Sequence, residues 1–180
     1  MAAAAASGGG VPEIRVAQGT YKPDQGAGQT PGSRTATFNP THVNDLKGGY
    51  AGLGQPDPDT RDIAAFKTVL SGDLNGDDQT GGTNAENSYS IFTIGSVYPY
   101  KIEGFTITAG NANAPCESAN CQGGGMNLGY CGTQVTDCTF EQNHGSAAAA
   151  VFITGWDSGP RFLRCQFRDN SAGYGGGALV

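Results

Sequence analysis

The chain has 180 residues, enough for one domain with a core or for a short stack of solenoid coils. Its 30 Gly and 9 Pro, beside 10 Lys+Arg and 16 Asp+Glu, indicate many tight turns and few long helices, and therefore an all-β protein. The formal net charge of −6 argues against nucleic acid and anionic membranes as partners, and no apolar run approaches the roughly 20 residues that a membrane span needs.

The chain divides into three predicted parts. Residues 1–12 lack the basic start and the apolar segment of a signal peptide, so we expect a disordered lead or a cloning remnant. Residues 13–88 are predicted to form an N-terminal cap with the first coils, and residues 89–180 to form regular coils. Because the chain stops at Val180 inside a repeat and without a capping sequence, we expect a C-terminal truncation of a longer protein.

Short strands separated by polar loops are predicted in the first half of the chain. The alternation of apolar and polar residues places strands at 13–17, 35–38, 46–50, 67–71 and 90–94, and a single helical turn at 63–66. Gly, Pro, Asp and Asn dominate the segments between them. Since no amphipathic helix is predicted between the strands, the pattern argues against a βαβ fold and favours a sandwich or a solenoid.

The second half of the chain contains one pattern three times. It occurs at 102–112, 135–145 and 162–172, with shifts of 33 and then 27 residues. Such a period predicts one solenoid coil per repeat, with equivalent residues stacked in columns about 4.8 Å apart. The repeats therefore favour the solenoid over the sandwich.

Alignment of the three repeats predicts which residues lie above one another. Two columns are apolar and one polar column lies between them: Phe105, Cys138, Cys165; Ile107, Phe140, Phe167; and Thr106, Thr139, Gln166. On the outer face, the predicted pairs across coils are Asp137 with Arg164 and Glu141 with Arg168. At the end of the strand, Asn143 is predicted to lie above Asn170, where an Asn can turn the chain and hydrogen-bond its neighbour. Opposite charges in register are also expected on the outer surface of a solenoid, so the charged residues of these pairs are assigned no catalytic role.

The segment Asp73-Leu74-Asn75-Gly76-Asp77-Asp78 begins like a calcium-binding loop, with oxygen donors at alternate positions around a Gly turn. The hypothesised ligands of a Ca²⁺ ion are Asp73, Asn75, Asp77, Asp78 and Glu86. The loop then departs from the EF-hand pattern, because Asp78 replaces its Gly and Asn84 replaces its bidentate Glu. A plain Asx-rich turn is the competing interpretation.

The five cysteines, Cys116, Cys121, Cys131, Cys138 and Cys165, are odd in number. A local disulfide between Cys116 and Cys121 is the hypothesis for an oxidising compartment, with Cys131 as the other candidate partner. A zinc site is disfavoured because close pairs of cysteines are missing. Cys138 above Cys165 is interpreted either as a disulfide or as two buried thiols.

Two motifs in the repeats resemble those of a known family. Phe140-Glu141-Gln142-Asn143 and Phe167-Arg168-Asp169-Asn170 resemble its Phe-x-x-Asn element, and Gly176-Gly177-Ala178-Leu179 resembles its Gly-Gly-Ala-Ile/Leu element. Both belong to right-handed parallel β-helix repeats of the polymorphic outer-membrane protein (autotransporter-adhesin) type, within the pectate-lyase-like superfamily. The resemblance implies a right-handed parallel β-helix with an N-terminal capping region, in a bacterial protein that is secreted or displayed on the cell surface.

Two functions are compatible with these features. The first is a non-catalytic extracellular or cell-surface module with a structural or adhesive role, whose partners are a cell-surface or matrix polysaccharide, a protein, or other copies of itself. The alternative is a carbohydrate-active β-helix enzyme, a polysaccharide lyase or glycoside hydrolase, or its N-terminal fragment. A groove with three or more convergent carboxylates would favour the enzyme, and flat, charge-paired faces would favour the module.

Overall fold

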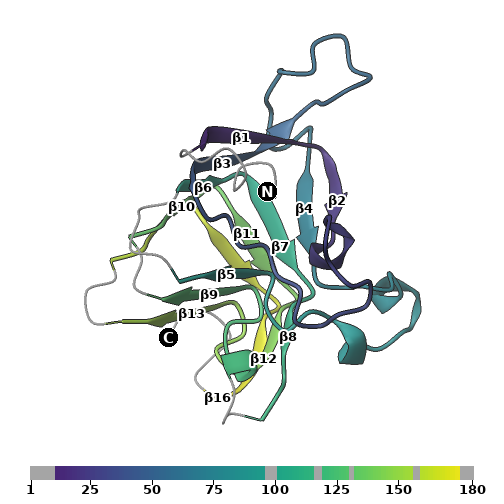
Figure 1. Ribbon diagram of the computed structural model, residues 1–180, viewed down its shortest axis with the longest axis vertical. Coiled ribbons are helices and arrows are strands. Elements are labelled where there is room, and N and C mark those ends of the chain that lie inside the picture. The colour runs from purple at the N-terminus through teal and green to yellow at the C-terminus, as the bar shows by residue number, and fades with distance from the viewer. Residues whose placement is uncertain (1–10, 96–100, 116–118, 130–131, 156–158, 175–180) are drawn as a thin grey trace.

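The computed structural model describes residues 11–95, 101–115, 119–129, 132–155 and 159–174, and this part of the chain is all-β (Figure 1). The helical elements within it are four short 3₁₀ turns: η1 (Pro23–Gln25), η2 (Asp78–Thr80), η3 (Asn84–Glu86) and η4 (Ala119–Cys121). Among the described residues, no helix has the length and apolar character needed to cross a membrane. The all-β class predicted from composition is confirmed.

The strands form four sheets, and the neighbouring strands within each sheet are parallel. Sheet A contains, in spatial order, β1 (Val11–Ala17), β3 (Val43–Tyr50), β6 (Lys101–Glu103), β10 (Gln134–Thr136) and β14 (Arg161–Leu163). Sheet B contains β2 (Gly19–Tyr21), β4 (Thr68–Ser71), β7 (Phe105–Thr108), β11 (Thr139–Glu141) and β15 (Gln166–Arg168). Sheet C contains β5 (Phe92–Ile94), β9 (Met126–Gly129) and β13 (Val151–Thr154), and sheet D contains β8 (Asn111–Ala112), β12 (His144–Ala147) and β16 (Ser171–Tyr174).

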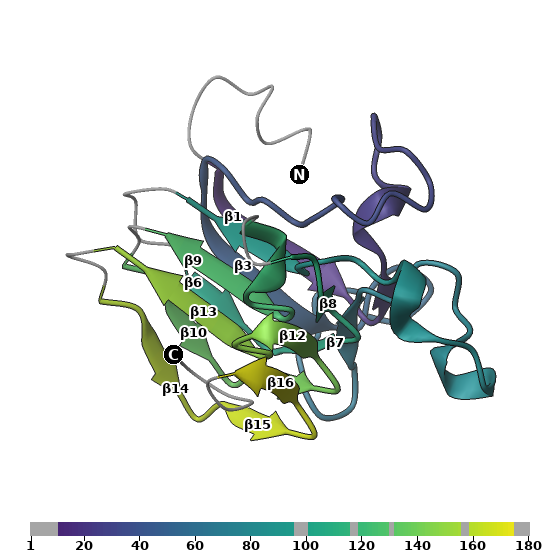
Figure 2. The ribbon, with the colours of Figure 1, turned by 90° about the horizontal axis from the view of Figure 1, so that it is seen from below.

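From β6 onward the chain visits the sheets in one repeated order, A, B, D and C. Each complete circuit therefore adds one strand to each of the four sheets. Figure 2 shows the strands of successive circuits lying beside one another in layers. Parallel neighbours require a connection that returns the chain to the same end of the sheet, and here the other sheets supply it. The arrangement is compatible with a β-helix-like fold.

The register between strands confirms the predicted columns. Phe140 pairs with Ile107 on one side and with Phe167 on the other, and the rings of Phe140 and Phe167 stack at 5.0 Å between centroids. Phe140 and Ile107 are fully buried, whereas Thr106 and Thr139 in the next column are half-buried. Burial of each large apolar side chain contributes about 1.5–3 kcal/mol, so these columns supply much of the stability of the core.

The predicted elements of the first half agree with the structure only in part. The strand expected at 35–38 is reduced to one bridge between Phe38 and Phe92, because hydrogen-bonded turns at Ser33 and Ala36 occupy the preceding backbone. The strand expected at 46–50 is longer, running over Val43–Tyr50. The single helical turn is present, since the Phe66 N–H donates to the Asp62 carbonyl (2.8 Å).

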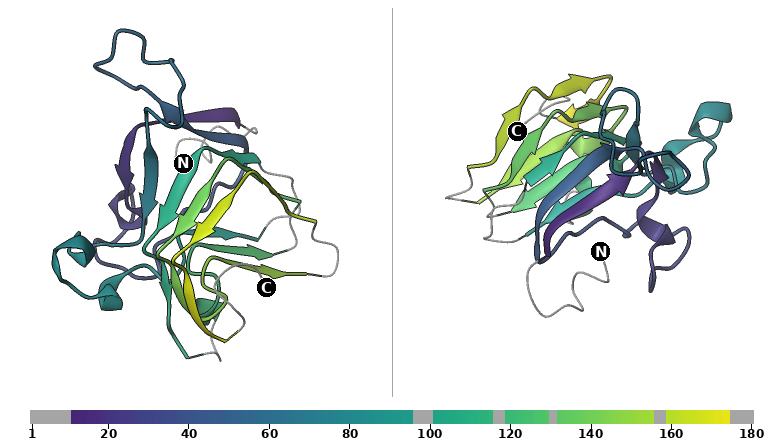
Figure 3. Two further views of the ribbon diagram at one scale, coloured as in Figure 1. Left: turned by 180° about the vertical axis from the view of Figure 1, so that it is seen from behind. Right: turned by 90° about the horizontal axis from the view of Figure 1, so that it is seen from above.

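Two long loops extend outside the sheets (Figures 1 and 3). The loop after β3 is closed at its base by a bridge between Tyr50 and Arg61 and by the Ala51 N–H, which donates to the Thr60 carbonyl (2.9 Å). The loop between β4 and β5, residues 72–91, contains η2 and η3 and lies beside the corner between sheets B and D. This second loop carries the predicted metal ligands.

Candidate metal centre

The first arm of the acidic loop is a tight turn built on Asp73. Its Oδ1 accepts hydrogen bonds from the backbone N–H groups of Gly76 (2.6 Å) and Asp77 (3.2 Å). The turn places Leu74 in the core, and the Leu74 carbonyl accepts a hydrogen bond from Lys22 Nζ (3.2 Å). An Asp three residues before a Gly with φ of 87° therefore folds the chain back, so that Asp73 and Asp77 face one region.

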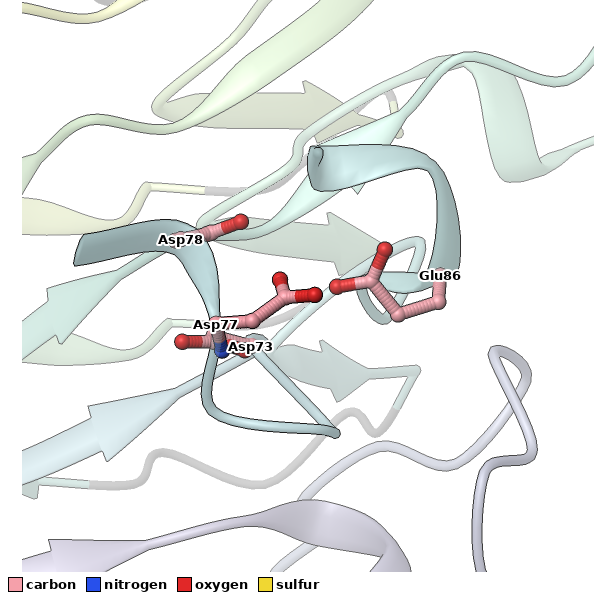
Figure 4. Close-up of side chains that lie close together, drawn as sticks. All are labelled: Asp73, Asp77, Asp78 and Glu86. Atoms are coloured by element: carbon pink, nitrogen blue, oxygen red, sulfur yellow. Dashed lines mark hydrogen bonds between the residues drawn. The ribbon is translucent and has the colours of Figure 1, made fainter. Parts of the chain in front are cut away.

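The second arm returns through η3 to Asn87, which is completely buried. The Thr83 side chain accepts a hydrogen bond from the Ala85 N–H (3.4 Å) and caps this turn. Glu86, at the end of η3, points its carboxylate toward that of Asp77 (Figure 4). The two arms are thereby brought face to face.

Four carboxylates converge between the arms. One ligand atom from each of Asp73, Asp77, Asp78 and Glu86 lies within 4.8 Å of the others. Asp73 is buried, and the other three are partly exposed. Burial, together with the nearby charges of Asp73 and Asp77, raises the pKa of Asp78, while its hydrogen bond from Asn87 opposes that shift. The cluster therefore concentrates negative charge that a cation can neutralise.

Unsatisfied oxygen atoms show that this cluster fits a metal ion. Among the described residues, seven buried side-chain atoms have no hydrogen-bond partner, and three of them are Asp77 Oδ1, Glu86 Oε1 and Asn87 Oδ1. An unpaired buried oxygen is costly, whereas coordination to a hard cation satisfies it. Carboxylate and amide oxygens are the donors such cations bind, so the residues present can hold a metal ion.

The structure brings together the four carboxylates among the five residues proposed from the sequence. Asn75, the fifth residue, is exposed: its Nδ2 donates to Asp77 Oδ2 (2.9 Å), and its Oδ1 accepts from the Asp77 N–H (3.1 Å). Asn87 was missed by the sequence analysis. Its only signal was an Asn directly after Glu86, which does not reveal that the side chain is buried against Asp78.

A groove of about 520 Å³ borders the metal loop. One wall is formed by loop residues that include Asp78, Gly82 and Asn84, and the opposite wall by coil-corner residues that include Gln142, His144 and Asp169. His144 Nδ1 lies 2.9 Å from Ser171 Oγ in the next strand. Among the described residues, two carboxylates, those of Asp78 and Asp169, line the groove.

The outer-face charges form the pairs that the repeats predicted. Arg164 donates two hydrogen bonds to Asp137 (2.6 and 2.7 Å), and Arg168 Nε donates to Glu141 (2.6 Å). The Arg164 guanidinium lowers the pKa of Asp137. These side chains neutralise one another instead of converging on a reacting atom.

Three of the five cysteines, Cys121, Cys138 and Cys165, lie within the described residues. Cys138 and Cys165 are both thiols, and burial raises the pKa of Cys138 to about 12 and also that of Cys165. Cys121 is fully buried. Cys116 and Cys131 lie outside the described residues, so the predicted disulfide between Cys116 and Cys121 stays a prediction.

Comparisons of the chain with protein families, with curated proteins and with solved structures found no match.

Proposed function

We propose that the chain is a non-catalytic module built as a right-handed parallel β-helix with an N-terminal cap, and that it has a structural or adhesive role in a secreted or cell-surface protein. The observation that carries this proposal is the pairing of outward charges across coils. The outer face carries two ion pairs, Asp137 with Arg164 and Glu141 with Arg168, in which opposite charges neutralise each other. Such a charge-paired face is what we expect of a non-catalytic module. Its partners would be a polysaccharide, a protein or further copies of the chain.

The groove is the one observation that favours an enzyme. It contains Asp78, Asp169 and His144, which are residue types that act as general acids and bases. Its described lining supplies two carboxylates, fewer than the three or more that would favour the enzyme, and His144 is engaged with Ser171. The module is therefore the better-supported function, with a polysaccharide lyase or glycoside hydrolase as the alternative.

A binding and turnover assay separates the two functions. The chain would be run through gels containing neutral or acidic polysaccharides, and the same polymers would be assayed for new reducing ends and unsaturated products. We expect retardation by at least one polymer or self-association in solution, without product. Product formation that is lost in Asp169→Asn would overturn the module in favour of the enzyme.

We further propose that the metal ion is Ca²⁺ and that it stiffens the N-terminal part of the chain. The donors are oxygens only, four of them from carboxylates, and Ca²⁺ accepts about 6–8 oxygen ligands in a flexible geometry, whereas Mg²⁺ keeps several waters and is bound through one or two carboxylates. Bound Ca²⁺ would raise the melting temperature, because a ligand that binds the folded state alone stabilises it. A melting temperature that is equal in EDTA and in millimolar CaCl₂ would overturn this proposal.

A further inference from the structure

The side-chain amide oxygen of Asn87 lies beside the acidic cluster and has no hydrogen-bond partner among the described residues. The residue is completely buried, and its Nδ2 donates to Asp78 Oδ2 (2.8 Å). An ionised carboxylate only accepts hydrogen bonds, so the amide nitrogen must face Asp78. Because both polar atoms belong to one planar amide, Oδ1 lies next to the cluster too, and it is left unsatisfied.

The backbone at Asn87 is firmly attached to the body of the protein. Arg34 Nε donates to the Asn87 carbonyl (2.7 Å), and the Arg34 guanidinium lies over the Tyr89 ring, 4.1 Å from its centroid. One residue later, the Ser88 N–H donates to the Gly72 carbonyl (2.9 Å). Asn87 is therefore a fixed ligand position on the sheet side of the loop.

The segment between the two arms, residues 79–83, forms part of one wall of the groove, and the next residue, Asn84, is anchored to β8 because its carbonyl accepts a hydrogen bond from Asn111 Nδ2 (2.6 Å). Gln79 and Thr83 are exposed, and Gly81 has a φ of 93°. The segment is tied to the first arm through the Asp77 carbonyl, which accepts hydrogen bonds from the N–H groups of Thr80 (2.9 Å) and Gly82 (3.0 Å). Asp77 therefore positions the first part of this wall, at Thr80 and Gly82.

We propose that Asn87 Oδ1 is a ligand of the metal ion and that the ion clamps the two arms of the loop together, which fixes the groove wall at residues 79–83. This inference rests on the proposed Ca²⁺ site. The ion joins Asp77, which holds the wall, to Glu86 and to Asn87, whose backbone is anchored by Arg34. Metal occupancy thereby sets the shape of the groove and, through it, the access of any groove ligand.

The test combines calorimetric titration with CaCl₂ and hydrogen exchange of the full chain. In the wild type we expect Ca²⁺ binding and slower exchange of the Thr80 and Gly82 amides when Ca²⁺ is added. Binding with unchanged exchange at these amides would overturn the clamp and leave the Ca²⁺ site standing. Absence of binding would overturn the site itself, so the two failures are distinguishable.

Two substitutions at Asn87 test its role as a ligand. Asn87→Leu removes the oxygen, and we expect the dissociation constant for Ca²⁺ to rise at least about tenfold. Asn87→Asp keeps an oxygen donor and adds charge, so its affinity should equal or exceed that of the wild type. Equal weakening in both variants would show that Asn87 acts only through its hydrogen bond to Asp78, and would overturn the assignment.

Asn75→Ala is the matched control. Asn75 belongs to the same loop and has the same side chain, but it is exposed and both of its polar atoms are engaged with Asp77. We expect the affinity of Asn75→Ala for Ca²⁺ to stay within about threefold of the wild type, since the variant retains the four carboxylates and Asn87. If Asn75→Ala lost as much affinity for Ca²⁺ as Asn87→Leu, the assignment of Asn87 would be overturned. The result would instead favour Asn75 as the ligand, as in an EF-hand loop.

Discussion

Asn143 and Asn170, one coil apart, are joined by two hydrogen bonds to a single oxygen. Asn170 Oδ1 accepts from the Asn143 N–H (3.1 Å) and from Asn143 Nδ2 (3.0 Å). Asn143 is completely buried, and it also donates to the Ile107 carbonyl (3.0 Å) and accepts from the Gly110 N–H (3.0 Å). One side chain thus satisfies the backbone at the corner of the preceding coil.

Asn143→Leu should destabilise the protein strongly. The substitution leaves the buried Gly110 N–H without the oxygen that accepts its hydrogen bond, which costs about 1–3 kcal/mol. Asn170→Leu is the control, because the same change occurs at a half-buried position where water can replace the lost bonds. Urea unfolding would measure both, and equal losses would contradict the role given to Asn143.

Glu13 should make stability depend on acid pH. Contacts with Lys47 Nζ (2.5 Å) and Arg15 Nε (2.7 Å) lower the pKa of Glu13 from 4.5 to about 2. Because the folded state favours the carboxylate, its contribution is complete above pH 4.5 and is lost as the pH falls through about 2. The wild type should therefore exceed Glu13→Gln in free energy of unfolding at pH 7, and the difference should shrink between pH 4.5 and 2.

A double-mutant cycle with Lys47→Met isolates the ion pair in this acid effect. In the Lys47→Met background, Glu13→Gln should change the pH dependence less than it does in the wild type, because the main partner is already absent. Urea unfolding at several pH values would measure the cycle. If the difference in free energy of unfolding between the wild type and Glu13→Gln grew toward acid pH, the prediction would be contradicted.

Gly82→Ala should weaken ion binding. A methyl group at Gly82 would overlap the carboxylate of Asp77 and force it out of its position in the cluster. We expect a dissociation constant for Ca²⁺ at least about tenfold higher by calorimetry. Gly132→Ala is the control, since a methyl group there meets nothing within 4 Å. Unchanged affinity in Gly82→Ala would remove Asp77 from the site.

Cys138 should resist alkylation in the native protein. Its thiol is 1% exposed, and burial raises its pKa to about 12, so almost no thiolate is present at pH 8. Cys165 is only partly buried and should react before Cys138 does. Peptide mass spectrometry after iodoacetamide treatment, with and without denaturant, would measure the order. If both residues become reactive only after reduction, they form a disulfide instead of two thiols.

The sequence by itself determined the all-β class, the columns and the charge pairs of the coils. It could do so because parallel strands in register stack equivalent residues, so a repeat in the sequence becomes a column in space, as for Ile107, Phe140 and Phe167. The acidic loop was also visible as a local cluster of donors. The repeat pattern was sufficient to predict those contacts that join equivalent positions of neighbouring repeats.

Only the tertiary structure decided which donors of the loop converge and what lies beside them. The approach of Asn87 to Asp78 depends on Arg34, which anchors the Asn87 backbone from a distant part of the chain, and no periodicity encodes that contact. Asn75 has the spacing of a ligand, but both of its polar atoms are engaged in hydrogen bonds with Asp77. The groove likewise exists because a non-repeating loop folds against the corners of the repeating coils, so its two walls share no sequence pattern.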